Sequence, residues 1–425
     1  MDSDTKVPSI EDLKSAGIPD PEYINEIHMK ARKAYSKSLE TQKGTIWLTN
    51  GYSLKPDAIE LGFRLYEEMI WKKADGRIPH LLENVKEELK QNLAKWIGSD
   101  RPQDISCGVC YTNFLMQILS CFWGKPVRIL TTDEEFYATT RIANRLREID
   151  GNVIKEVPLF PLEDFNKRFY EEACKEKYDL VIISHVFFKC GVVLDDLDEL
   201  ILKLKTKVGR IIIDGGGSFG NVSTSKSLGH VMDDIYYIGG TFKFIGAGEG
   251  FTFMSLPKGC QDRPVFTGWL FGDISEKQYY SLPVEYPEGG DKYSHSTTEM
   301  SIWVRVNEVM KYFDKEMFTV EMKNQYTRTL QDCFIRQLNE KKISFLSEKN
   351  LVTNVNGKWR ALQLVFEMKD EKISAKEVSV RMARHRIIFD PKGTRLRICL
   401  PIYYNIFDMD VVIEKLQELD AELKD

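Results

Sequence analysis

The segment DIYYIGGTFKFIGAGEGFTFMSL, residues 234–256, contains two apolar strand-like runs that flank a glycine-rich turn with a single lysine. Lys243 lies between Phe242 and Phe244, and the next charged residue along the chain is Glu249. A solvated surface position is the ordinary place for a lysine, because its ammonium group is strongly hydrated. An apolar, partly desolvated position instead favours loss of the proton, which makes the amine a nucleophile. The segment indicates a strand end with a reactive lysine, and a surface lysine is the alternative.

The composition argues against several classes of function. The chain has 425 residues, of which 43% are hydrophobic and 29% are charged, as in soluble globular proteins of two or three domains. Its formal net charge of −5, without a basic block, gives no indication of a nucleic-acid partner. No apolar run approaches the roughly 18 residues of a membrane span, and the N-terminal MDSDTKVPSIEDLK lacks the features of a secretory signal. We therefore expect a cytoplasmic protein with no membrane partner.

The cysteines and histidines do not indicate a metal site. Cys107 and Cys110 form a single C-x-x-C pair, without the second pair or the histidine cluster of a zinc site. The six histidines are scattered along the sequence and show no metal-binding spacing. In a reducing cytosol the eight cysteines are expected to be free thiols. No metal is therefore expected.

Strand-like and helical segments alternate through the middle of the chain. Amphipathic helical stretches lie around residues 137–149, 162–176 and 195–206. The apolar strand-like runs are PVRILTTD, NVIKEVPL, YDLVIISHVFF, GRIIIDGGG, DIYYIGG and GFTFMSL. This alternation predicts an α/β fold with a mostly parallel sheet that is covered on both faces.

The sequence pattern changes near both ends and predicts three parts. Residues 1–45 are polar and helix-leaning, and we interpret them as an N-terminal helical arm. Residues 46–300 contain the alternating segments and form the large domain. Residues 301–425 contain long helical stretches followed by strand-like runs such as RALQLVFEM and RLRICLPIYY. They predict a smaller C-terminal α+β domain.

Functional residues are expected directly after the strands, because open α/β sheets bind ligands at the carboxyl ends of their strands. Asp214 ends GRIIID before three glycines, where it either holds a turn or pairs with a ring nitrogen cation. Phe136 follows PVRILTTD, where it is either a core residue or lies flat against a planar ring. Cys110, Tyr111 and Thr112 precede an apolar helix, whose N-terminus has an ordinary cap or binds a phosphate.

Together these features meet the requirements of pyridoxal 5′-phosphate (PLP). The amine of Lys243 can form an imine with the PLP aldehyde, and the carboxylate of Asp214 can keep the pyridine nitrogen protonated. The protonated ring then accepts electrons from a substrate carbanion. Phe136 can stack on the ring, and the helix N-terminus can bind the phosphate. The order and placement of these residues indicate a PLP-binding protein.

The motifs resemble those of fold-type I PLP enzymes of the class V aminotransferase superfamily, and in particular its kynureninase-like branch. The resemblance rests on IWLTNGYSLKPD, ISHVFFKCG, IIIDGGGSFGN, IYYIGGTFKFIGAGEGFTFMSLP, RPVFTGWLF and TRLRICLPIYYN. It extends from about residue 45 to about residue 420. It implies a large PLP-binding domain with a mostly parallel sheet of the seven-stranded type, a smaller C-terminal domain, and a homodimer.

The resemblance assigns a role to each matching residue. It implies that Lys243 holds PLP, that Asp214 pairs with the pyridine nitrogen, and that Phe136 stacks on the ring. Arg397 is implied to bind the substrate α-carboxylate, a bidentate task for which arginine is suited, although nearby Arg395 leaves the register open. Further implied residues are Cys110, Tyr111, Thr112, Ser184 and Trp269 for the cofactor, Thr297 or Thr298 for the phosphate across a dimer interface, and Asn50 and Gly51 for the substrate.

Two positions differ from true kynureninases and affect the expected reaction. Gly217 replaces a histidine three residues after Asp214, and Phe242 replaces a tyrosine before Lys243. These differences argue against hydrolytic cleavage of kynurenine, whereas transamination needs only Lys243 to move the proton. We therefore expect an aminotransferase that acts on an amino acid or amine, with a keto acid as the acceptor. The alternatives are a kynureninase-like hydrolase or β-eliminating lyase, and a non-catalytic PLP-fold binding protein, which the presence of both Lys243 and Asp214 disfavours.

Overall fold

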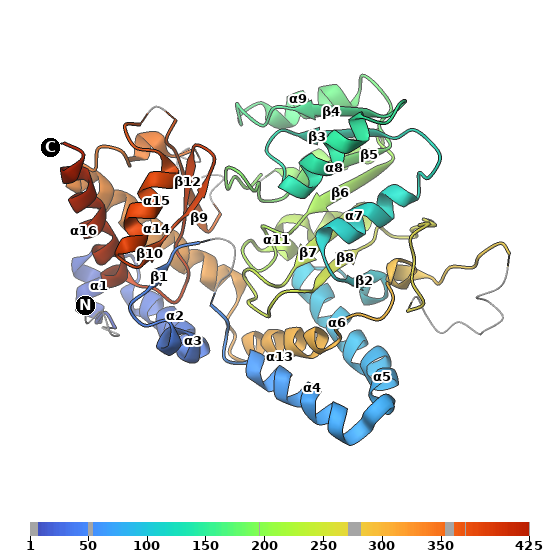
Figure 1. Cartoon of the computed structure of the whole chain (residues 1–425), viewed down its shortest axis with the longest axis horizontal. Helices are drawn as coiled ribbons and strands as arrows, with labels where there is room; N and C mark the ends of the chain where they lie inside the picture. Colours follow the sequence, from blue (N-terminus) through green and yellow to red (C-terminus); the bar gives the residue numbers. More distant parts are fainter. Residues whose placement is uncertain are drawn as a thin grey trace. The chain divides into compact units, whose positions relative to one another are not determined.

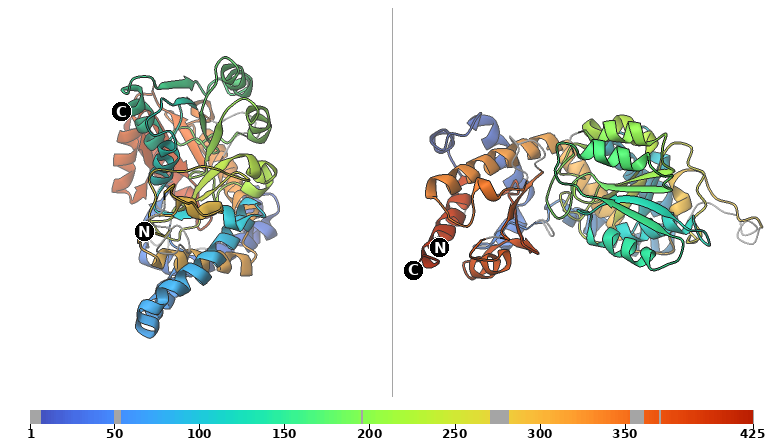
Figure 2. Two further views of the ribbon diagram at one scale, coloured as in Figure 1. Left: turned by 90° about the vertical axis from the view of Figure 1, so that its right-hand side faces the viewer. Right: turned by 90° about the horizontal axis from the view of Figure 1, so that it is seen from above.

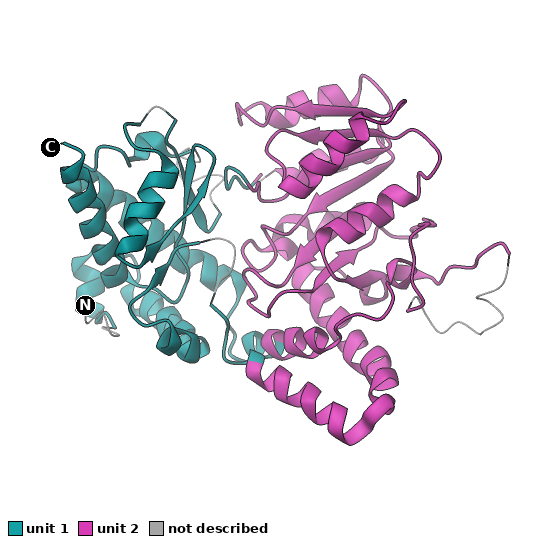
Figure 3. Cartoon of the chain, viewed as in Figure 1, with its two compact units in different colours: residues 1–59, 189–193, 311–425 teal, residues 60–188, 194–310 magenta. Residues whose placement is uncertain are grey.

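The computed structural model describes residues 7–49, 54–194, 196–270, 282–352, 361–369 and 371–424. The chain divides into two compact units, which are coloured separately in Figure 3. Unit 1 consists of residues 1–59, 189–193 and 311–425, and unit 2 consists of residues 60–188 and 194–310. The N-terminal and C-terminal segments of the chain thus belong to the same unit. Figure 1 shows the elements in chain order.

In the part of the chain that the structure describes, unit 2 is built on a seven-stranded sheet. In spatial order its strands are β2 (Ile105–Gly108), β8 (Thr252–Ser255), β7 (Tyr236–Gly240), β6 (Arg210–Asp214), β5 (Leu180–Ser184), β3 (Arg128–Thr132) and β4 (Val153–Val157). Strand β8 runs antiparallel to both of its neighbours, and the other neighbouring pairs are parallel. The predicted α/β fold with a mostly parallel sheet is confirmed.

Helices cover both faces of this sheet, as the view from above in Figure 2 shows. Every residue of β5 and β7 is buried, as expected for strands with a covered sheet face on either side. Helices α7 (Tyr111–Ser120) and α8 (Tyr137–Arg147) pack on one face, where Ile118 and Ile142 meet Ile182 and Ile212 of the strands. Helices α9 (Phe165–Ala173) and α10 (Leu197–Leu204) contact each other on the opposite face.

A helical segment precedes the sheet of unit 2. Its last helix, α6 (Lys86–Ile97), buries Leu89, Leu93 and Ile97 at four-residue spacing and ends at Gly98, whose positive φ of 75° suits glycine. Before α6 come α4 (Ile59–Lys73), α5 (Arg77–His80), a π-helical turn (Leu81–Val85) and a 3₁₀ turn at Ala74–Gly76. Later in the chain lie α11 (Thr224–Leu228), α13 (Ser301–Lys315), and 3₁₀ turns at Pro102–Asp104, Gly229–Asp234 and Gly289–Tyr293. Across the described ranges, no helix combines the length and apolar composition required to cross a membrane.

Unit 1 contains two small sheets. The three-stranded sheet has the order β11 (Asp390–Lys392), β12 (Arg395–Cys399) and β9 (Gln363–Glu367), and both pairings are antiparallel. Strand β1 (Ile46–Trp47) pairs in parallel with β10 (Ile387–Ile388) and joins the N-terminal segment to the C-terminal one. The helices of this unit are α1 (Ile10–Ser15), α2 (Pro21–Ala34), α3 (Ser36–Thr41), α14 (Val320–Lys341), α15 (Ala375–Arg384) and α16 (Ile406–Glu422), with a 3₁₀ turn at Glu348–Asn350.

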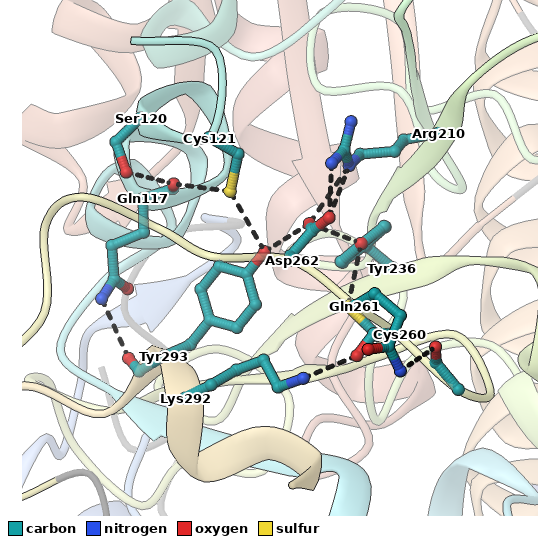
Figure 4. Close-up of polar contacts among 11 residues, drawn as sticks. Gln117, Ser120, Cys121, Arg210, Tyr236, Cys260, Gln261, Asp262, Lys292 and Tyr293 are labelled. Carbon is teal, nitrogen blue, oxygen red and sulfur yellow. Dashed lines mark hydrogen bonds and ion pairs between the residues drawn. The ribbon is translucent and has the colours of Figure 1, made fainter. Parts of the chain in front are cut away.

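A hydrogen-bonded network joins the amino ends of two strands of the unit 2 sheet (Figure 4). Arg210 begins β6, and its Nε donates to the carboxylate of Asp262 at 3.1 Å. Tyr236 begins β7, and its hydroxyl donates to the same carboxylate at 2.7 Å. The hydroxyl of Tyr293 donates to the same carboxylate at 2.6 Å. Burial alone would raise the pKa of Asp262, but these donors outweigh burial and hold the pKa below its usual range. The network therefore fastens the edge of the sheet opposite to Asp214.

Candidate active site

Three neighbouring strands bring predicted site residues to the carboxyl edge of the unit 2 sheet. Ser184 ends β5 and Asp214 ends β6, and the two are directly paired in the register of these parallel strands. Strand β7 pairs with the other side of β6, with Ile238 opposite Asp214, and the chain then leads into the loop that carries Lys243. The sheet topology thus assembles residues that are up to 59 positions apart in the sequence.

Asp214 is a buried carboxylate held by the glycines that follow it. The backbone N–H of Gly216 donates to its Oδ1 at 2.8 Å. Gly215 has no room for a side chain, because a Cβ there would lie 2.3 Å from the ring of Tyr237. Burial raises the pKa of Asp214, although the Gly216 hydrogen bond and the charge of Lys243 act in the opposite direction. The lysine and the aspartate therefore interact electrostatically, as the predicted site requires.

Lys243 lies in the glycine-rich loop between β7 and β8 and is partly buried. Its Nζ is 5.9 Å from the ring centroid of Phe188 and 5.6 Å from that of Phe242. The loop then passes through Gly246 and Gly248, whose φ angles of 72° and 97° are left-handed conformations that favour glycine. Of the two phenylalanines that flank Lys243 in the sequence, Phe242 is thus close to the amine, and the glycines let the chain turn back into β8.

An aromatic cluster connects Phe136 with Lys243. Phe136 precedes α8, and its ring centroid is 5.0 Å from that of Phe188, which in turn contacts the lysine. Tyr111 lies 6.4 Å from Phe136 in an edge-on arrangement, and Tyr137 lies 5.0 Å from Phe188. Phe188 and Tyr137 were missed by sequence reasoning. The position of Phe188 just after a strand, in ISHVFF, was the signal that could have found it.

The first turn of α7 lies beside this cluster. Cys110 occupies the position before the helix, and its thiol donates to Oδ1 of Asn113 at 2.6 Å. The hydroxyl of Tyr111 is 2.9 Å from Oγ1 of Thr139. Burial and the charge of Asp214 raise the pKa of Tyr111 well above its usual value, which places the tyrosine near the aspartate. The helix turn predicted to bind the phosphate thus carries a tyrosine that is affected by the charge of Asp214.

A second group of predicted residues lies at a cavity beside α7. The indole N–H of Trp269 donates to Oγ1 of Thr297 at 3.1 Å. Thr297 and Thr298 line a cavity of about 370 Å³ together with Asn113 of α7. Asn113 also bonds to Cys110, so this cavity adjoins the N-terminus of α7 where the phosphate is expected. The two threonines and the helix start are thus on the same side of unit 2.

Arg397 belongs to unit 1, where it is buried in the small antiparallel sheet. It is only 2% exposed, and its guanidinium pairs with Asp390, the residue opposite it on β11. Arg395 instead pairs with Glu367 at 3.1 Å. The alternative of a solvent-facing Arg397 is therefore wrong, while its role as the substrate-carboxylate ligand stays a prediction. Asn50 and Gly51 lie outside the described residues.

The chemistry of these residues fits PLP. A buried carboxylate at a strand end suits the protonated nitrogen of a pyridine ring, and the adjacent lysine supplies an amine for the aldehyde. The aromatic side chain of Phe136 and the start of a ten-residue helix supply a ring surface and a phosphate position. Lys243, Asp214, Phe136 and Tyr111 would hold the cofactor.

The comparisons with known proteins agree with this fit. The Aminotransferase class-V family model matches residues 76–360, about two thirds of the chain. No curated protein matches the sequence. The kynureninase-like branch is not specified by the family match and stays a prediction.

Solved structures resemble nearly the whole chain. A lysine-to-alanine mutant of C-DES, with glycine covalently linked to its PLP cofactor, is 16% identical with a TM-score of 0.77, over 90% of this chain and 98% of that one. The cystine C–S lyase C-DES with its product cysteine persulfide is 16% identical with a TM-score of 0.75, over 89% and 99%. A cysteine desulfurase from Thermococcus onnurineus NA1 is 15% identical with a TM-score of 0.74, over 93% and 98%. The chain is a PLP-dependent enzyme of the aminotransferase class-V family.

Proposed function

We propose that this enzyme is a β-eliminating lyase that cleaves the carbon–sulfur bond of a cysteine-like amino acid. The observation that carries the proposal is the resemblance, over about nine tenths of the chain, to a cystine C–S lyase and to a cysteine desulfurase. The sequence alone favoured an aminotransferase, with the lyase as its alternative. Both reactions begin with the removal of the Cα proton, so Lys243 and Asp214 serve either one.

The distribution of cysteines favours release of the sulfur product into solution. All eight cysteines are free thiols in the described residues, and Cys174 is the exposed one. Cys174 follows α9 and precedes β5, so it lies near the amino end of that strand, whereas Ser184 lies at the carboxyl end. Cys110 is in the site, but its thiol donates a hydrogen bond to Oδ1 of Asn113. A fully exposed thiol is therefore not among the described site residues.

Each residue has a defined task in the proposed reaction. Arg397 binds the substrate carboxylate, and Asp214 holds the proton on the pyridine nitrogen. When bound, PLP supplies a conjugated ring that takes up the electron pair left at Cα. The amine of Lys243 removes the Cα proton, the Cβ–S bond breaks, and the sulfur leaves as a thiol. Addition of water to the remaining three-carbon unit yields pyruvate and ammonia.

The cofactor is tested by the visible absorbance of the purified protein. We expect a yellow band in the wild-type enzyme that is absent after Lys243→Ala. Phe244→Leu is the matched control, because it changes the next residue in the loop and leaves the amine in place. A wild-type protein that does not develop the band with added PLP would contradict the proposal, as would a band that persists in Lys243→Ala.

The reaction type is tested by product analysis without and with a keto acid. The holoenzyme is incubated with cysteine, cystine or S-methylcysteine, and pyruvate, ammonia and thiol are measured. The lyase gives equal amounts of pyruvate and ammonia without 2-oxoglutarate. Conversion of amino acids only when pyruvate or 2-oxoglutarate is supplied would identify an aminotransferase instead. Formation of alanine from kynurenine would identify the kynureninase-like hydrolase.

The same proposal includes a homodimer in the cytoplasm. The cavity beside Thr297 and Thr298 is bordered by exposed apolar side chains, with Trp269 and Met116 each 47% exposed. Such a surface supports a contact with a second copy of the chain. Light scattering of the holoenzyme tests the dimer. The free cysteines are compatible with a reducing compartment.

A further inference from the structure

A second buried carboxyl group lies at the active-site edge of the sheet. Glu135 directly precedes Phe136 and is completely buried. Its Oε1 accepts hydrogen bonds from the backbone N–H of Ser184 at 3.2 Å and from Oγ1 of Thr132 at 2.9 Å. Its Oε2 lies 2.5 Å from Oγ of Ser184. Glu135 thus connects the end of β3 with the end of β5.

The surroundings of Glu135 disfavour its charged form. Burial raises the pKa of this carboxyl to about 8, and the charge of Asp214 adds to the effect, although the hydrogen bonds from Ser184 and Thr132 oppose it. Of the ionisable groups around Glu135, Asp214 on β6 disfavours a further negative charge, whereas Tyr111 on α7 is neutral because its own pKa is raised well above its usual value. The carboxyl is therefore mostly protonated at neutral pH.

The location of the proton follows from the hydrogen bonds. Oε1 already accepts two, so the acid proton belongs on Oε2. Oγ of Ser184 donates to Oε2 across this 2.5 Å contact when the carboxyl is ionised. In the protonated form Oε2–H donates to Oγ instead, and the hydroxyl proton of Ser184 is available to another acceptor. The state of Glu135 therefore decides whether Ser184 acts as a donor or as an acceptor toward the site.

We propose that Glu135 is a positioning residue that orients the hydroxyl of Ser184 as a hydrogen-bond donor toward the bound cofactor. Ser184 is suited to this role because it is paired in register with Asp214, which faces the pyridine nitrogen in the proposed function. The inference rests on that function, since it assumes that PLP occupies the carboxyl edge of the sheet. Glu135 acts through Ser184 and does not touch the reacting atoms.

The test is a pH titration of the visible absorbance of the holoenzyme between pH 5 and pH 10. We expect a step near pH 8 in the wild type that Glu135→Gln removes, because the amide donates to Ser184 at every pH. Ser184→Ala removes the same step, and adding Glu135→Gln to it changes nothing further. Glu134→Gln is the matched control, since it alters the neighbouring carboxyl, which is also buried, and we expect it to titrate like the wild type. Circular dichroism checks that each variant is folded.

Cofactor affinity gives a second measurement. We expect Glu135→Ala and Ser184→Ala each to raise the PLP dissociation constant by about tenfold, the equivalent of one hydrogen bond. The double variant should show about the same tenfold loss, because the two residues act in series. A double variant whose PLP dissociation constant is raised about a hundredfold would overturn the inference, because the two residues would then act independently. An absorbance titration of Glu135→Gln that is identical to the wild type would overturn it as well. If the wild type has no Lys243-dependent band, the proposed function and this inference fail together. If the band forms but the Glu135 variants match the wild type, the inference alone fails.

Discussion

Lys323 is a buried lysine in unit 1, and its replacement by methionine is expected to stabilise the protein. It lies in the first turn of α14 and is 2% exposed. Its Nζ is 3.8 Å from the ring centroid of Phe313 and 5.3 Å from that of Phe318. Burial lowers the pKa of Lys323 from 10.5 to about 7. The side chain thus has an apolar, aromatic environment that disfavours its charge.

The size of the effect follows from that pKa. A lowering of about 3.5 pKa units corresponds to about 5 kcal/mol of lost stability when the unfolded chain carries the proton. The unfolded state binds more protons between about pH 7 and pH 10.5, so the free energy of unfolding rises with pH across this window. The penalty is therefore fully present below pH 7 and absent above pH 10.5. Since the cation–π contact with Phe313 offsets about 1–2 kcal/mol, Lys323→Met should gain about 3 kcal/mol near pH 7.

Urea unfolding of the wild type and Lys323→Met at pH 7, 8.5 and 10 measures this gain. Lys341→Met is the matched control, because Lys341 is an exposed lysine at the other end of the same helix. We expect Lys323→Met to raise the unfolding midpoint most at pH 7 and least at pH 10, while Lys341→Met shows no trend. A gain that stays constant with pH, or a loss of stability at pH 7, would refute the reasoning.

Three other predictions concern separate parts of the molecule. Arg397→Lys should raise the KM for the amino acid at least tenfold and leave the visible cofactor band unchanged, because lysine cannot bind a carboxylate through two parallel bonds; Arg395→Lys is the control. Asp262→Asn should lower the free energy of unfolding by about 3 kcal/mol in urea, since Arg210 loses its buried carboxylate. Burial lowers the pKa of His28 and of His185 from 6.5 to about 4. As the pH falls, the unfolded chain therefore binds a proton at each histidine before the folded chain does. The free energy of unfolding, measured in urea, should fall by about 2 kcal/mol per histidine by pH 5.

Most of the fold could be predicted from the sequence because most strands of the unit 2 sheet are apolar runs. Six strands of the unit 2 sheet correspond to such runs, and the helices between them show clear amphipathic spacing. Strand β2 was missed, because ISCG is only four residues long and contains a serine, a cysteine and a glycine. The grouping of the N-terminal segment with the C-terminal one could not be predicted, because it depends on contacts between distant segments, such as β1 with β10 and α2 with α14.

The candidate site was only partly predictable. Lys243, Asp214 and Phe136 could be selected from local sequence, because they follow strands or lie in distinctive glycine-rich surroundings, and their roles stay predictions. Glu135 was missed because an acid in TTDEEFYATTR resembles an ordinary turn residue, and its importance comes from a strand that lies 49 residues further along. Arg397 and Arg395 could not be separated by periodicity, since residues two apart on a strand point to the same face. Their partners, Asp390 and Glu367, are set by strand pairing in three dimensions.

The Asp262 network has a consequence for altering the enzyme. It fastens β6 and β7 at their amino ends, whereas Asp214 and Lys243 lie at or beyond the carboxyl ends of the same two strands. A strand secured at one end can tolerate changes in the loop at the other end without losing its place in the sheet. Positions beyond Asp214 and around Lys243, other than the glycines and the cofactor-binding residues, are therefore suitable for redesigning substrate preference, provided that the tyrosine–aspartate–arginine anchor is kept intact.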